Sequence, residues 1–346
     1  MPLRENQRKR LPGMIAAGLM ILVTLLWTFW GTAEMYHEGW WGAWTNRLPY
    51  LIPIAVCLLP TLLGISWPFV GGGLILALSV FVFFFFGPQL FFFYLPAAAV
   101  GGLFIWDGRM KRRAPEAFPK SEVWWRRNLL RIMAIGGTLT TMFAVSAFNL
   151  PIVLTRIDDG DRGARLIEGN GVALIWAPEG PGWNYRQPWG GFPSWQSLAL
   201  YEVSPVGLDD KPGNEWGAPD FAYASSEDMQ NGNLCSYLSA DGLTLMQERQ
   251  DIWRMPTADE LVRSLGRHGI NAGCTWDGVV GQRVSCEVQP DKESPLWSTD
   301  FAAIYYWAAD EFDENEAVFV SYNGWVNATH KTSGNPRHSY RCVRAP

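Results

Sequence analysis

The chain has 346 residues and a formal net charge of −5, which is divided unevenly along its length. No Asp, Glu, Lys, Arg or His occurs from Leu48 to Trp106, and a run of 59 residues without charge excludes a wholly water-soluble protein. After residue 131 the chain has 15 basic and 27 acidic residues, a net charge of −12, and this argues against nucleic acid as a partner because its backbone is anionic.

Five apolar segments are long enough to cross a bilayer, which takes about 20 residues in a helix. The first follows a basic stretch within residues 1–10, and its apolar core is longer than that of a cleaved signal peptide, so we expect an uncleaved span. Gly and Pro at residues 64–68 and 87–88 divide the uncharged run into three helices. The predicted transmembrane region is 11–154, with spans at 11–31, 48–64, 68–86, 89–106 and 128–153.

The Lys and Arg residues indicate an orientation, because cytoplasmic loops retain positive charge. Residues 1–10 hold four basic residues and the predicted loop 107–127 holds seven, whereas residues 32–47 hold one. We therefore expect an inner (cytoplasmic) membrane of the bacterial type, with the N-terminus cytoplasmic and the acidic domain periplasmic or extracellular. The three middle spans lack ionisable groups, which favours an anchor, or a surface for other membrane subunits, over a transporter.

Cysteine usage agrees with an oxidising compartment for the acidic domain. Four of the five cysteines lie there, without the CxxC spacing of a zinc site. We expect two disulfides, and four cysteines leave three pairings open. The four are Cys235, Cys274, Cys286 and Cys342.

Residues 155–169 are polar and are interpreted as a linker, whose acidic stretch lacks the spacing of an EF-hand calcium loop. Residues 171–176 predict a strand. Apolar residues at helical spacing from Leu234 to Leu238 predict a first helix carrying Cys235. Residues 257–260 form a capping box that predicts a second helix, and residues 317–322 predict a further strand.

Two motifs resemble those of a known domain family. Residues 251–261, DIWRMPTADEL, resemble the WRLPT-x-x-EL motif of Lcl C-terminal-type domains, and residues 340–344, YRCVR, resemble the family's closing YVRCVR. The pair Tyr306 and Trp307, residues 317–326, and Trp176 to Trp183 fit the same order. Physically, Trp253 suits a core, Thr257 a helix cap and Arg254 a pairing with a carboxylate or with carbonyl groups.

The resemblance covers residues 170–344 and implies a C-type-lectin-like fold related to formylglycine-generating, or sulfatase-modifying, enzymes. The predicted fold class is thus a membrane all-α bundle of about five spans followed by an α+β domain, residues 170–346, with two helices and short antiparallel strands. In that fold the first helix packs beside the last strand. The resemblance therefore implies a disulfide between Cys235 and Cys342, which leaves Cys274 to pair with Cys286.

Binding is the function that the sequence favours. An oxidase of the formylglycine-generating type needs an accessible thiol pair, and none is left over, so no catalytic residue is predicted. The resemblance places the residues after Trp307 among ligand-facing loops, while residues 290–297 are a second candidate loop that suits packing equally well. The ligand-binding candidates are Trp307, Asp310, Glu311, Asp313, Glu314 and Trp325.

Clustered carboxylates also suit calcium, although a solvated acidic turn produces the same pattern, and no other cofactor is predicted. We interpret the chain as a membrane-anchored, non-catalytic recognition module for a glycan, peptide or protein ligand. An accessory or structural subunit of a larger membrane complex is the alternative, and a formylglycine-generating-like enzyme ranks third.

Overall fold

The computed structural model describes residues 5–118, 123–186, 191–201, 223–333 and 336–346. Internal contacts divide the chain into a helical unit, Met1–Trp40 with Trp44–Val153, and a C-terminal unit, Leu154–Pro346 with Trp41–Ala43. Residues 119–122 of the predicted basic loop lie outside the described residues.

The helical unit contains the five predicted apolar helices. Candidate membrane spans are Lys9–His37, Trp44–Ser66, Pro68–Phe86, Pro88–Arg113 and Leu129–Leu154. They are formed by α1 (Glu5–His37), η1 (Trp44–Leu51) with α2 (Ile52–Ser66), α3 (Pro68–Phe86), η2 (Pro88–Leu90) with α4 (Phe91–Arg113), and α6 (Leu129–Leu154). Two short elements, η3 (Pro115–Ala117) and α5 (Trp124–Arg127), lie between α4 and α6. The expectation of five helices long and apolar enough to cross a membrane is confirmed.

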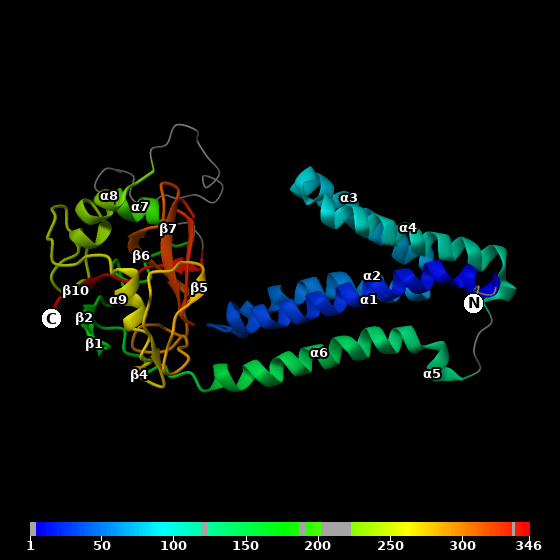
Figure 1. The fold of residues 1–346 in the computed structure, drawn as a ribbon, viewed down its shortest axis with the longest axis horizontal. Helices are drawn as coiled ribbons and strands as arrows, with labels where there is room; N and C mark the ends of the chain where they lie inside the picture. Colours follow the sequence, from blue (N-terminus) through cyan, green and yellow to red (C-terminus); the bar gives the residue numbers. More distant parts are fainter. Residues whose placement is uncertain (1–4, 119–122, 187–190, 202–222, 334–335) are drawn as a thin grey trace. The chain divides into compact units, whose positions relative to one another are not determined.

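The first helix continues past its predicted end at Gly31. This glycine does not cap the helix but allows a close approach, because the backbone oxygen of Tyr50 lies where a Cβ of residue 31 would be. Gly71 likewise brings α3 against the backbone of Gly64 in α2. In Figure 1, α1 runs beside α2 and α3 beside α4. Small residues at such interfaces let helices pack where lipid provides no hydrophobic driving force.

The C-terminal unit is built from small, mostly antiparallel sheets. β1 (Arg165–Gly169), β2 (Val172–Trp176) and β10 (Val343–Arg344) form one, and β3 (Gly266–Arg267) pairs with β4 (Ile270–Asn271). The largest sheet has the order β5-β8-β7-β6-β9, in which only β9 runs parallel to its neighbour. Its strands are β5 (Gln282–Arg283), β6 (Tyr305–Glu311), β7 (Glu316–Ser321), β8 (Trp325–His330) and β9 (His338–Ser339). The predicted strands at 171–176 and 317–322 are present within one residue of their expected bounds.

Three short α-helices, rather than two, are found among the described residues of this unit: α7 (Trp195–Ala199), α8 (Ser226–Asn231) and α9 (Ala258–Arg263). Thr257 and Glu260 form the predicted capping box of α9. The helix expected to carry Cys235 is divided. α8 ends before Gly232, and Asn233 then caps a separate 3-10 helix, η4 (Leu234–Tyr237), by accepting a hydrogen bond from the Cys235 backbone N–H.

The buried tryptophans form the core of this unit. Trp176, Trp183 and Trp297 lie in one cluster, and Trp195 and Trp253 lie in another, each at most 2% exposed. The expectation that Trp253 fills a core is therefore confirmed. Arg254, next to it, donates to both carboxylate oxygens of Glu260 at 2.6 and 2.7 Å, which is the carboxylate pairing expected from the sequence.

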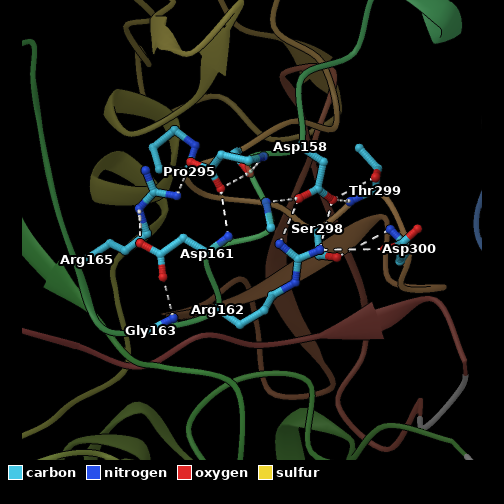
Figure 2. A network of polar contacts seen from close by, with 12 residues as sticks. Asp158, Asp161, Arg162, Gly163, Arg165, Pro295, Ser298, Thr299 and Asp300 are labelled. Carbon is cyan, nitrogen blue, oxygen red and sulfur yellow. Dashed lines mark hydrogen bonds and ion pairs between the residues drawn. The ribbon is translucent and has the colours of Figure 1, made fainter.

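The segment predicted as a linker belongs to the folded unit. Residues 165–169 form β1, and Asp158 accepts hydrogen bonds from Arg162 and from the Thr299 hydroxyl, both at 2.7 Å (Figure 2). Burial alone would raise the pKa of Asp158, but the bonds from Arg162 and Thr299 hold it well below its ordinary value. Thr299 is 141 residues away from Asp158, so the local sequence of this segment does not reveal the contact.

Candidate functional site

The acidic stretch 310–316, which includes the end of β6 and the turn that follows, contributes mainly to the folded structure of its own unit. The Asp310 carboxylate accepts a hydrogen bond from the Ala258 backbone N–H at 2.6 Å, at the start of α9. Burial raises the pKa of Asp310, and the bond from Ala258 only partly offsets this effect. Asp313 accepts from the backbone N–H groups of Asn315 and Glu316 at 2.7 and 2.8 Å, which closes the turn between β6 and β7.

Glu311 is tied to two distant segments. Its Oε1 accepts from Lys331 Nζ at 2.7 Å, and its Oε2 accepts from the backbone N–H and the hydroxyl of Ser226 at 2.8 and 2.6 Å. Burial alone would raise the pKa of Glu311, but the bonds from Lys331 and Ser226 lower it. Of the four predicted acidic ligand residues, Glu314 is the one whose carboxylate is exposed and without a partner among the described residues.

No three His, Cys, Asp or Glu side chains come together as a possible metal site in the described part of the chain. The acidic stretch therefore has the geometry of a closed turn with internal partners, and calcium binding there stays a prediction.

The two tryptophans predicted to meet a ligand have opposite environments. Trp307 is 0% exposed and packs against His338, with ring centroids 4.9 Å apart, so its side chain is in the core and not at a ligand-facing surface. Trp307 faces the core because of its position on β6. The sequence does not reveal this, because a single aromatic residue in a strand does not indicate which face of the sheet it lies on. Trp325, the first residue of β8, is 40% exposed. Of the predicted aromatic pair, only Trp325 can meet a molecule from solvent.

The second candidate loop is packed inside the unit. Asp291 and Glu293 are buried, and both pair with Arg267 at 2.6 Å, while Asp291 also pairs with Arg156 at 2.9 Å. Lys292 is 2% exposed and donates to the backbone oxygen of Phe301. Residues 290–297 thus hold the segment after α6 against the domain and do not form an open loop.

An open pocket of about 240 Å³ lies beside the Cys274–Cys286 disulfide. Its lining combines an indole ring, a carboxylate, an amide and a guanidinium, which together offer an apolar surface, hydrogen-bond acceptors and donors. The lining residues are Thr275, Trp276, Asp277, Gln282, Arg283, Val284 and Ser285.

The loop around this pocket is constrained at both ends. The disulfide joins its two sides, and the Thr275 backbone N–H donates to the Ser285 carbonyl at 2.8 Å. At the tip, Asp277 accepts from the Val279 backbone N–H at 3.0 Å, and Gly278 has a φ of 86°, a conformation that glycine adopts without strain. In the second half of the loop, the backbone N–H of Val284 donates to the carbonyl of Gly324 at 2.8 Å, and Gly324 directly precedes Trp325. The pocket is therefore attached to the edge of the largest sheet.

Arg283 and Trp325 extend the pocket along this edge. They are directly paired on the antiparallel strands β5 and β8, so their side chains point to the same side of the sheet. Both are exposed, and the Arg283 guanidinium has no ion pair or hydrogen bond with any residue that the structure describes. A ring face and a free planar donor group are thereby presented together to solvent.

Sequence reasoning identified Trp325 but missed the rest of this site. Trp276, Asp277, Gln282 and Arg283 attracted no attention because each is an isolated residue within a Gly-rich stretch. The available signal was their position between Cys274 and Cys286, since a short loop closed by a disulfide can hold side chains in place without a core of its own.

The disulfides pair as the resemblance implied. Cys235 is bonded to Cys342, with Cα atoms 5.7 Å apart, and Cys274 to Cys286, with Cα atoms 4.0 Å apart. The fifth cysteine, Cys57, lies in α2. All four cysteines of the C-terminal unit are therefore oxidised, and none carries the thiolate that metal binding or nucleophilic attack requires.

Three comparisons address the relationship of the chain to other proteins. No family model matches the chain, no curated protein matches it, and no solved structure matches it. The Lcl-type resemblance consequently rests on the motifs in residues 170–344 alone.

Proposed function

We propose that the chain is a membrane-anchored, non-catalytic recognition protein whose C-terminal unit binds a saccharide outside the cytoplasm through the pocket beside Trp325. The observation that carries the proposal is the exposed pair Arg283 and Trp325, of which Arg283 lines the constrained pocket and Trp325 is its direct partner on β8. A sugar ring has an apolar C–H face that suits an indole, and hydroxyl groups that suit the Asp277 carboxylate, the Gln282 amide and the Arg283 guanidinium.

The anchor and its orientation are supported by separate observations. Five helices have the length and composition of membrane spans. Two disulfides in the C-terminal unit fit an oxidising compartment outside the cytoplasm, and the many Lys and Arg residues within 107–131 fit the cytoplasmic side. The motif resemblance over residues 170–344 supports a C-type-lectin-like fold for the C-terminal unit.

A saccharide is favoured over a peptide or protein ligand by the size and polarity of the site. A pocket of about 240 Å³ is small for a folded partner, and its charged and amide side chains, Asp277, Gln282 and Arg283, are exposed. Both cysteine pairs are disulfides, which leaves no thiolate for chemistry of the formylglycine-generating type, and this supports a recognition role over that chemistry.

The test uses the intact protein in lipid nanodiscs, probed on an array of defined oligosaccharides and then by calorimetry with any saccharide that is retained. Trp325→Ala and Arg283→Gln should each weaken binding at least tenfold, because truncation of a central aromatic or arginine anchor costs about 2 kcal/mol. Phe312→Ala is the matched control, since Phe312 is 53% exposed in the turn after β6 and should leave binding unchanged.

Three outcomes count against the proposal. The first is that no saccharide binds, and the second is that binding survives both pocket substitutions. The third is that other membrane proteins co-purify with the chain in stoichiometric amounts in mild detergent while no saccharide binds. This result would favour an accessory subunit instead.

A further inference from the structure

At one end of the helical unit, the start of α1 meets the end of α4 and the segment that follows it, about 100 residues later in the sequence. Arg10 in α1 donates through Nε to the carbonyl of Ala117 in η3 at 2.6 Å. The ring of Phe118 lies 5.7 Å from the Arg10 guanidinium and 5.9 Å from Lys111 Nζ in α4. The start of α1, the end of α4 and the segment after it therefore meet at this end.

This end carries many basic side chains and few acidic partners. Arg109, Lys111, Arg112, Arg113, Arg126, Arg127 and Arg131 are all exposed. Of these seven, Lys111 is the one for which a carboxylate partner is found among the described residues, Asp107 at 2.7 Å. The arginines therefore present positive charge to solvent, with no carboxylate partner in the part of the chain that the structure describes.

Two tryptophans lie beside these arginines in the short helix α5. Trp124 is 63% exposed and Trp125 is 51% exposed, and the Arg126 guanidinium lies 5.1 Å from the Trp125 ring. Tryptophan is enriched where the hydrocarbon of a bilayer meets its headgroups, because one part of the ring is apolar and its N–H is polar. α5 directly precedes α6, which has the length and composition of a membrane span.

We propose that the exposed basic residues of 109–113 and 126–131, together with Trp124 and Trp125, form a binding surface for anionic phospholipid headgroups. The guanidinium group of an arginine donates two parallel hydrogen bonds to phosphate oxygens, and the tryptophans place these guanidinium groups at the depth of the lipid headgroups. A zwitterionic lipid fits less well, because its ammonium group would lie against unpaired guanidinium groups. Clusters of four to eight Lys or Arg next to a membrane span bind anionic lipids for the same reason.

The experiment measures lipid retention by the full chain. The protein is reconstituted in nanodiscs with equal amounts of phosphatidylglycerol and phosphatidylcholine, extracted with mild detergent, and the retained lipids are counted by mass spectrometry. Wild type should retain phosphatidylglycerol preferentially. Arg126→Gln with Arg127→Gln should reduce this preference by about fivefold for each arginine lost, since each basic residue near an anionic surface contributes about 1 kcal/mol.

Two further variants separate charge from loss of fold. Arg126→Lys with Arg127→Lys keeps the charge and should retain most of the preference. Arg249→Gln with Arg263→Gln removes the same charge from the C-terminal unit and should retain all of it. Equal retention of the two lipids by wild type, an unchanged preference in the Arg126/Arg127 glutamine variant, or an equal loss in the control would each overturn the proposal. None of these outcomes depends on saccharide binding at Trp325.

Discussion

Glu311 and Lys331 form an ion pair inside the C-terminal unit, with 2.7 Å between Oε1 and Nζ. The Lys331 side chain is 1% exposed, and its ammonium group also donates to the carbonyls of Ala224 and Glu314 at 2.8 and 3.0 Å. A carboxylate that looked like a surface ligand in the sequence is thus the charge partner of a buried lysine.

The first prediction follows from this pair. Glu311→Gln should lower the free energy of unfolding by about 2 kcal/mol, because it leaves a buried ammonium group without its anion. Glu314→Gln is the matched control and should have little effect, since the Glu314 side chain is exposed. Urea unfolding followed by circular dichroism measures both. Equal midpoints for the two variants would show that the pair does not stabilise the unit.

The second prediction concerns the disulfides. The Cys235–Cys342 bond spans 107 residues and the Cys274–Cys286 bond spans 12. On the chain-entropy model, their loss costs about 5 and about 3 kcal/mol, because the longer loop has more freedom when it is open. Cys342→Ser should therefore lower the melting temperature of the C-terminal unit more than Cys286→Ser, as measured by calorimetry. The reverse order would contradict this explanation.

The third prediction is a pH dependence centred on His338. Burial lowers the pKa of His338 to about 3 from its ordinary value of 6.5, and its ring lies among Tyr305, Trp307 and Phe319. In the unfolded chain the imidazole binds a proton below pH 6.5, whereas in the folded protein it stays neutral down to about pH 3. Stability should therefore fall as the pH drops from 6.5 toward 3, by about 1.4 kcal/mol per pH unit for this one proton.

His338→Phe isolates this contribution, because it removes the titrating group and keeps an aromatic ring in the cluster. The difference in unfolding free energy between wild type and variant should change across pH 6.5 to 3 and be constant above pH 7. Asp158 has a lowered pKa, but it is present in both proteins and cancels in the comparison. A difference that is independent of pH would show that His338 is protonated equally in both states.

The fourth prediction tests the proposed orientation. A phosphatase that matures only outside the cytoplasm should be active when fused after Pro346 and inactive when fused after Ala114, which follows the basic end of α4. A fluorescent protein that matures only in the cytoplasm should give the opposite pattern. Phosphatase activity at Ala114 and none at Pro346 would invert the proposed orientation.

Features that depend on local sequence could be predicted. The five apolar helices follow from apolar segments of sufficient length, and the α9 capping box follows from Thr257 and Glu260, which are three residues apart. The pairing of Cys235 with Cys342 could also be stated in advance, but only through the motif resemblance, since spacing alone left three possibilities.

Features that depend on distant partners required the tertiary structure. Glu311 has a structural role because Ser226, 85 residues away in the sequence, donates a hydrogen bond to it. Asp158 is held in the C-terminal unit because Thr299, 141 residues away, donates a hydrogen bond to it. Trp307 is buried and Trp325 is exposed, although both belong to strands of the same sheet. Trp307 lies within β6, and Trp325 is the first residue of β8. Hydropathy and spacing report what a residue prefers, whereas its exposure and hydrogen-bond partners depend on which remote segments pack against it.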